Sequence, residues 1–119
     1  MNGNPYDVPE LTVEELAQRL ERGDGLILLD VREPVEREMA QLDGEVEAAP
    51  VSALVRQGEE ALPEGARDRD AEIVVYCHHG IRSAQVVAWL RQQGWNSVWN
   101  MAGGIDAYAR RVDPSVGFY

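Results

Sequence analysis

The side chains most able to do chemistry lie in one short run, residues 76–83, which holds the only cysteine of the chain, Cys77. The run follows an apolar stretch that predicts a buried strand, and it carries Gly80 and Arg82 ahead of an expected helix. A thiol in this position lies where backbone N–H groups and a helix N-terminus converge on its sulfur. Such donors, with a cation nearby, favour the thiolate, which attacks sulfur or phosphorus centres. We therefore expect Cys77 to be a nucleophile and not merely a small buried hydrophobe.

Charged residues on two segments are candidates to support this loop. Arg82 either binds an anionic substrate or braces the loop by pairing with an acid such as Asp30 or Glu33, and the sequence leaves both roles open. Asp30 and Arg32 follow a second apolar run, residues 26–29. We expect these two side chains to form a buried, hydrogen-bonded brace under the loop.

Two histidines, His78 and His79, follow the cysteine directly. Zinc sites require three or four ligands at suitable separations, and the chain has no further Cys or His. No metal is therefore predicted. We expect both imidazoles to line the loop, where one helps to keep Cys77 ionised, although the sequence does not say which.

Length and charge limit the class of protein. The 119 residues predict a single domain over residues 1–119, with a core at about 10–111 and a tail at 112–119. The chain has 11 Arg, no Lys and 21 acids, and its net charge of −10 disfavours binding to nucleic acid or to anionic membranes. This acidity is explained by solubility, or by a docking surface for a basic partner. Because no apolar run reaches about 18 to 20 residues and the start does not resemble a signal peptide, we expect a cytoplasmic protein.

Alternating strands and helices predict an α/β fold. Thr12 and Glu15 form a predicted capping box for the first helix, and short unbroken apolar runs are typical of strands buried on both faces of a parallel sheet. Right-handed crossovers then place helices on both faces. Helices are expected at 12–22, 34–39, 52–57, 83–93 and 105–111, strands at 26–30, 45–48, 72–76 and 97–100, and surface loop over the rest of 41–72.

Ligands of such sheets bind beyond the carboxyl ends of the strands. Three segments follow strand ends and should converge on one edge, namely residues 30–33, 77–82 and 100–104. We therefore expect the cysteine loop to lie beside the other two segments.

Three motifs resemble those of a single-domain, rhodanese-type sulfurtransferase. They are Asp-Val-Arg-Glu-Pro at 30–34, Tyr-Cys-His-His-Gly-Ile-Arg-Ser at 76–83 and Asn-Met-Ala-Gly-Gly-Ile-Asp-Ala-Tyr at 100–108. The resemblance implies a rhodanese-like fold, a central and mostly parallel sheet of about five short strands with helices on both faces. Residues 44–50 depart from the usual family pattern by one extra residue, which affects only the edge strand.

The resemblance also implies a two-step reaction. Cys77 takes the outer sulfur of a donor such as thiosulfate, becomes a persulfide, and passes that sulfur to a thiophilic acceptor, either a thiol or a sulfur-carrier protein. The loop residues His78, His79, Gly80, Ile81, Arg82 and Ser83 would bind the substrate and the persulfide, supported by Asp30, Arg32 and Glu33. No cofactor beyond the covalent persulfide is expected.

Two alternatives remain open at this point. One is a sulfur-relay or docking module that receives sulfur from a partner protein at an exposed site and is weak on small donors. The other is a cysteine-dependent phosphatase or arsenate reductase. Those enzymes place five residues between Cys and Arg, whereas His78, His79, Gly80 and Ile81 make four here. The shorter loop favours a single sulfur atom over a tetrahedral oxyanion.

Overall fold

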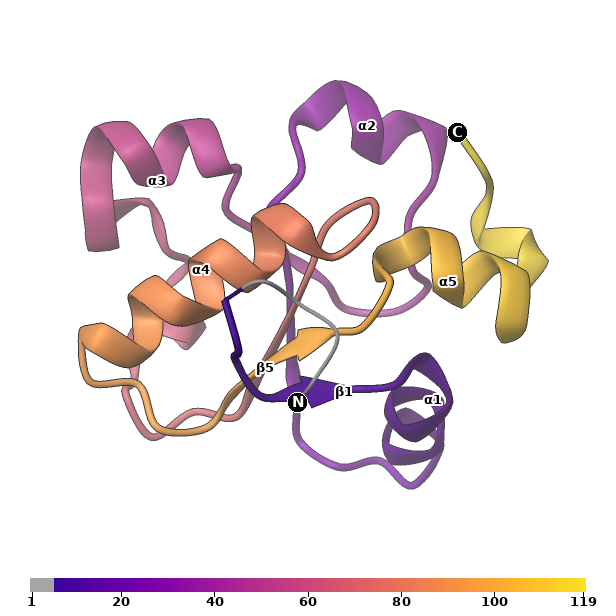
Figure 1. Cartoon of the computed structure of the whole chain (residues 1–119), viewed down its shortest axis with the longest axis horizontal. Helices are drawn as coiled ribbons and strands as arrows, with labels where there is room; N and C mark the ends of the chain where they lie inside the picture. The colour runs from indigo at the N-terminus through magenta and orange to yellow at the C-terminus, as the bar shows by residue number, and fades with distance from the viewer. Residues whose placement is uncertain (1–5) are drawn as a thin grey trace.

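A computed structural model describes residues 6–119, and a five-stranded sheet runs through its centre (Figure 1). The strands are β1 (Glu10–Leu11), β2 (Ile27–Asp30), β3 (Glu47–Ala48), β4 (Ile73–Tyr76) and β5 (Val98–Met101). In space they follow the order β1-β5-β4-β2-β3, and every pair is parallel. The α/β fold and the parallel sheet expected from the sequence are confirmed.

Helices surround this sheet and begin close to the expected residues. They are α1 (Val13–Glu21), α2 (Pro34–Met39), α3 (Val51–Gln57), α4 (Ile81–Gln92) and α5 (Gly104–Arg111), with 3₁₀ turns η1 (Gly58–Ala61), η2 (Glu64–Arg67) and η3 (Pro114–Val116). The predicted capping box of α1 is present, because Glu15 N donates to Thr12 Oγ1 at 3.1 Å and Thr12 N donates to Glu15 Oε1 at 2.9 Å. No helix within residues 6–119 has the length and apolar character needed to span a membrane.

Both faces of the sheet are buried, as the unbroken apolar strands predicted. In β4, Ile73 and Val75 pack with α3 and α4, whereas Val74 and Tyr76 pack with α1 and α5. All four side chains are fully buried. Alternate residues of one strand therefore belong to two separate cores. The central strand β4 is fixed from both sides, and so is the loop that leaves it.

The segment 41–72 is more ordered than expected. It was predicted to be mostly surface loop, but Leu62 and Ala66 are buried, and Trp95 Nε1 donates to Ala66 O at 2.9 Å. The expectation is wrong for η1 and η2 because each turn is too short to show a hydrophobic period. The edge strand β3 and the short helix α3 do form near their predicted positions.

One strand, β1, was missed. It has only two residues, with Glu10 opposite Asn100 and Leu11 opposite Met101. Two residues cannot show an alternating pattern, so no sequence signal indicated this strand. Its position beside β5 brings the segment before α1 to the edge of the sheet where the cysteine loop lies.

Helix α5 closes against the cysteine loop through its backbone. Ile105 N donates to Cys77 O at 2.9 Å, and Asp106 N donates to His78 O at 3.1 Å. Gly104 makes this approach possible: its φ of +67° is left-handed, and a Cβ there would overlap the His78 carbonyl and lie 2.7 Å from Cys77 O. The start of α5 therefore fixes the first two residues of the loop.

Replacing Gly104 by Ala should destabilise the fold strongly. Backbone strain and overlap with the loop together should lower the free energy of unfolding by more than about 3 kcal/mol. Gly44 is a matched control, because its φ is +90° but a Cβ there would have no atom within 4 Å. Gly44→Ala should lower the free energy of unfolding by only about 1–2 kcal/mol. Urea denaturation of both variants measures the difference, and equal losses would contradict the proposed contact.

Candidate active site

Cys77 follows the last residue of β4, and its sulfur points into the loop that follows it. Gly80 N donates to Sγ at 3.2 Å and Ser83 N donates at 3.4 Å, while Ser83 Oγ lies 3.3 Å from Sγ. These donors surround the sulfur at the N-terminus of α4, where unpaired backbone N–H groups carry partial positive charge. The loop is therefore built to stabilise negative charge on Sγ.

The sulfur is less accessible than the sequence suggested. An exposed site was expected at the edge of the sheet, but Cys77 is only 1% exposed, so that expectation is wrong. The cause is the position of β4 between β2 and β5, together with the fold of the loop back over the strand end. The arrangement that provides N–H donors also leaves little of the thiol open to a donor.

Helix α4 begins two residues earlier than predicted, at Ile81 and not at Ser83. Its N-cap is Gly80, whose φ of +98° is left-handed, and a Cβ at this position would lie 3.2 Å from Gly103 N. Arg82 and Ser83 therefore belong to the first helical turn. This explains why the N–H of Ser83 is free to donate to the sulfur. The Ile81 side chain is exposed and takes no part in these contacts.

Asn100 holds the loop from the neighbouring strand. Ser83 Oγ donates to its Oδ1 at 2.5 Å, and its Nδ2 donates to Gly80 O at 3.1 Å and to Glu10 Oε2 at 2.8 Å. The side chain is fully buried. The sequence placed this residue in a segment that converges on the site but assigned it no role there. Its position at the end of β5, facing the loop, shows that it links β1 and β5 to the loop backbone.

Arg82 pairs with Glu36, a residue that the sequence did not single out. Both terminal nitrogens of the guanidinium donate to the two carboxylate oxygens, each at 2.7 Å. The expected partners Asp30 and Glu33 are not the ones used, since Glu33 instead accepts from Ser52 Oγ at 2.6 Å. Hydrogen bonds from Arg82 lower the pKa of Glu36 to about 2. The pair is therefore charged at neutral pH.

Asp30 and Arg32 form a buried ion pair beneath the site. Arg32 Nη2 donates to Asp30 Oδ2 at 2.8 Å and Nε donates to Oδ1 at 3.0 Å, and both side chains are fully buried. Arg32 also donates to Ala40 O at 2.7 Å and to Tyr119 Oη at 3.2 Å. A buried arginine is tolerated only where its donors are satisfied, as they are here.

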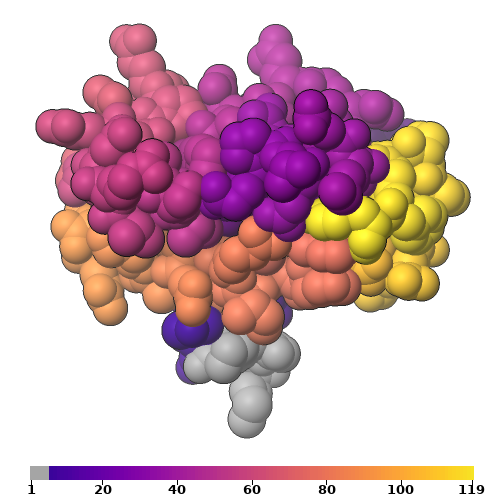
Figure 2. Space-filling model, turned by 90° about the horizontal axis from the view of Figure 1, so that it is seen from above, coloured from indigo at the N-terminus to yellow at the C-terminus, as the bar shows by residue number. Residues whose placement is uncertain are grey.

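The two histidines lie on the side of the loop next to the C-terminal residues. The His78 ring stacks on Tyr119 with centroids 3.7 Å apart, and the His79 ring lies 3.9 Å from His78. Desolvation, and then the neighbouring His79, lower the pKa of His78. Figure 2 shows the C-terminal residues, in yellow, packed beside α2 and the loop. No sequence pattern indicated that Tyr119 contacts the site.

A possible set of metal ligands lies on this side of the loop. His78, His79 and Asp106 have ligand atoms within 4.8 Å of one another, and His78 Nε2 has no hydrogen-bond partner among the described residues. The prediction from the sequence counted only Cys and His as metal ligands and therefore missed the carboxylate of Asp106. Asp106 already accepts from Arg110 Nε at 2.9 Å, so a cation partner occupies it.

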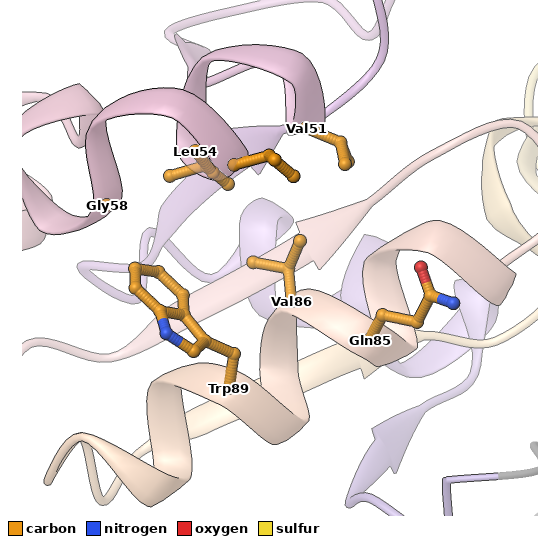
Figure 3. Close-up of a pocket in the computed structure, with 7 residues that line it drawn as sticks. Val51, Leu54, Gly58, Gln85, Val86 and Trp89 are labelled. Atoms are coloured by element: carbon orange, nitrogen blue, oxygen red, sulfur yellow. The ribbon is translucent and has the colours of Figure 1, made fainter.

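An apolar pocket lies between α3 and α4, away from the sulfur (Figure 3). Its volume is about 400 Å³, and Cys77 does not line it. The lining residues are Val51, Leu54, Val55, Gly58, Gln85, Val86 and Trp89. The chemistry of the thiol is therefore separate from this apolar pocket.

The Glu36–Arg82 pair should make stability depend on acid pH. Because the pKa of Glu36 falls from 4.5 to about 2 on folding, its contribution is complete above pH 4.5 and is lost as the pH falls towards 2. Glu36→Gln should lower the free energy of unfolding at pH 7 by about 1–2 kcal/mol, allowing for partial exposure, and flatten the pH profile below 4.5. Urea titrations at several pH values measure this, with Glu38→Gln on the same helix as the control. An unchanged profile would contradict the role of the pair.

Tyr119 should restrict access to the thiol by holding His78 in place. Tyr119→Ala removes the ring on which His78 stacks, so the loop should open more often and iodoacetamide should alkylate Cys77 about three to ten times faster. Phe118→Ala is the matched control, because that ring is 51% exposed and contacts Arg110. Intact mass measured over time gives both rates. Equal rates in the two variants would contradict this role.

Comparisons with known proteins bear on the same loop and fold. A family model described as a rhodanese-like domain matches residues 12–111. A protein named Sulfurtransferase from Allochromatium vinosum is 35% identical over 109 residues, covering 92% of this chain and 95% of that one. The human single-domain sulfurtransferase TSTD1 is structurally similar, with a TM-score of 0.72 and 27% identity, over 87% of this chain and 96% of that chain.

Some relatives are much longer. The probable adenylyltransferase/sulfurtransferase MoeZ of Mycobacterium tuberculosis is 37% identical over 109 residues, but the match covers 92% of this chain and only 26% of that protein. The family match and the sulfurtransferase relatives support a role in sulfur transfer in general. The resemblance carried by the three sequence motifs is confirmed, and the chain belongs to the rhodanese-like domain family.

Proposed function

We propose that this protein is a sulfurtransferase that moves a sulfane sulfur from a donor such as thiosulfate to a thiophilic acceptor through a persulfide on Cys77. One observation carries the proposal: Sγ of the only cysteine accepts hydrogen bonds from Gly80 N and Ser83 N at the N-terminus of α4. Amide donors around a sulfur stabilise its anion, both as a thiolate and as a persulfide.

The first step transfers the outer sulfur of the donor. The Cys77 thiolate attacks the outer sulfur of thiosulfate, and a new S–S bond forms as the bond to the sulfonate sulfur breaks. Sulfite leaves with the electron pair, and the negative charge of the persulfide rests on its outer sulfur. In the second step an acceptor thiolate attacks that outer sulfur, and Cys77 leaves as a thiolate. Neither step requires an external oxidant or reductant.

The loop residues have distinct roles in this scheme. Gly80 and Ser83 provide backbone donors to the sulfur, and Ser83 Oγ, 3.3 Å from Sγ, can turn from Asn100 to donate to the anion. Arg82 places a guanidinium beside the loop. His78, His79 and Ile81 shape its outer side. Arg32, paired with Asp30, supports it through Tyr119, and Glu33 supports it through the bond from its N–H to Glu36. No metal or cofactor takes part.

The acceptor and the setting follow from the same chemistry. MoeZ combines adenylyltransferase and sulfurtransferase in its name, and we propose by analogy a thiol or a sulfur-carrier protein as the acceptor. A reducing compartment such as the cytoplasm would keep a single cysteine free. The four residues between Cys77 and Arg82 speak against phosphatase chemistry, which uses a wider loop.

Replacement of Cys77 by Ser tests the proposal directly. The wild-type protein, incubated with saturating thiosulfate or with a low-molecular-weight persulfide, should gain the mass of one sulfur atom, and cyanide should remove it as thiocyanate. Cys77→Ser should show no gain and lose at least about 1,000-fold in turnover, since no other thiol can replace the nucleophile. Intact mass spectrometry gives the result. If neither donor adds sulfur to the wild-type protein, the proposed function is wrong.

A further inference from the structure

The guanidinium of Arg82 is already paired with an acid. Its two terminal nitrogens each lie 2.7 Å from one oxygen of Glu36. The same carboxylate accepts from Glu33 N at 3.0 Å and from Tyr119 Oη at 3.0 Å. Four hydrogen bonds from three residues therefore fix Glu36 in this position. The Glu36–Arg82 ion pair is therefore held in one geometry, unlike a solvent-exposed pair that forms only part of the time.

This ion pair is partly open to solvent and does not lie in the core. The side chain of Arg82 is 35% exposed and that of Glu36 is 18% exposed. Hydrogen bonds that Arg82 donates to Glu36 raise the pKa of Arg82 most, and electrostatic interaction with Cys77 raises it further. A donor that reaches the sulfur therefore comes within electrostatic range of Arg82 and of the carboxylate bound to it.

The pairing leaves the loop without an unpaired arginine or lysine. Arg82 is the only Arg or Lys in residues 77–83. Desolvation, and then the neighbouring His79, lower the pKa of His78, which disfavours the charged form of its imidazole. A dianion such as thiosulfate gains little from an arginine whose charge is cancelled by Glu36. A donor with less negative charge loses less by this pairing, because it depends less on a cation.

We propose, building on the sulfur transfer proposed above, that Glu36 is a positioning residue that sets donor preference. By pairing with Arg82, it lowers the affinity of the site for the dianion thiosulfate more than for sulfane-sulfur donors of lower charge, such as organic thiosulfonates and thiol persulfides. The sulfur chemistry at Cys77 is unchanged. With methanethiosulfonate, the thiolate takes the outer sulfur and methanesulfinate leaves with the electron pair.

A purely structural role for Glu36 makes a different prediction. If the pair only braced the loop, its loss would change the rate with every donor to the same extent. If Glu36 sets preference by charge, its loss should lower KM for each donor according to the charge of that donor. The comparison of a dianion with a monoanion that carries the same outer sulfur therefore separates the two roles.

The experiment measures kcat and KM of Glu36→Gln with thiosulfate and with methanethiosulfonate, using cyanide as acceptor. Freeing Arg82 should lower KM about tenfold for thiosulfate and about threefold for methanethiosulfonate, with smaller changes in kcat. Glu38→Gln is the matched control, since it removes the same charge from an exposed position of α2. Its KM values should stay within about twofold of wild type. The double variant Glu36→Gln/Arg82→Met should not show this decrease in KM.

Several results would overturn this inference. Equal changes for both donors, an equal effect of Glu38→Gln, or a decrease in KM that survives loss of Arg82 would each do so. Far-UV circular dichroism checks folding, and Glu36→Met replaces Glu36→Gln if the latter unfolds. Sulfur addition to Cys77 distinguishes failure of this inference from failure of the proposed function. If wild type gains sulfur but KM does not follow donor charge, only this inference fails; if no donor adds sulfur to any variant, the proposed function fails with it.

Discussion

The site depends on two backbone N–H groups that point at one sulfur. Gly80 and Ser83 can donate to Sγ of Cys77 only because the loop turns back over the end of β4 and α4 begins at once. The left-handed backbone of Gly80 makes that turn possible. Neighbouring elements hold this turn. The parallel sheet fixes the strand end, and the start of α5 fixes the loop carbonyls.

Two charge pairs surround this loop at different depths, and one tyrosine joins them. Asp30 and Arg32 are fully buried, whereas Glu36 and Arg82 are partly open to solvent. Tyr119 accepts from Arg32 and donates to Glu36. Hydrogen-bonded networks of this kind position their members more firmly than isolated pairs do. The Glu36–Arg82 pair is therefore fixed in position relative to the Asp30–Arg32 pair.

The sequence predicted those features that have local signals. The capping box at Thr12 and the strand–loop–helix pattern around Cys77 both appear in the structure, because a few neighbouring residues determine them. The two-residue strand β1 and the 3₁₀ turns η1 and η2 were missed, since each is too short to show a hydrophobic period. The burial of the thiol was also missed, because it depends on how the loop folds over the strand.

Contacts between distant segments explain the rest of the difference. Glu36 lies 46 residues from Arg82 in sequence, and Tyr119 lies 83 residues from Glu36. Nothing near either residue indicates these partners. Pairing of an arginine with some acid could be expected, but the choice among several nearby acids depends on the direction in which α2 leaves the sheet. Only the three-dimensional arrangement resolves such choices.

The contact between α5 and the loop also limits how this site can be redesigned. The carbonyls of Cys77 and His78 are both committed to the amides of Ile105 and Asp106. Any added residue would thus have to enter between His79 and Arg82, where the described residues form no backbone hydrogen bond to α5. The loop between Cys77 and Arg82 can therefore be lengthened only in this short segment if its contact with α5 is to be kept.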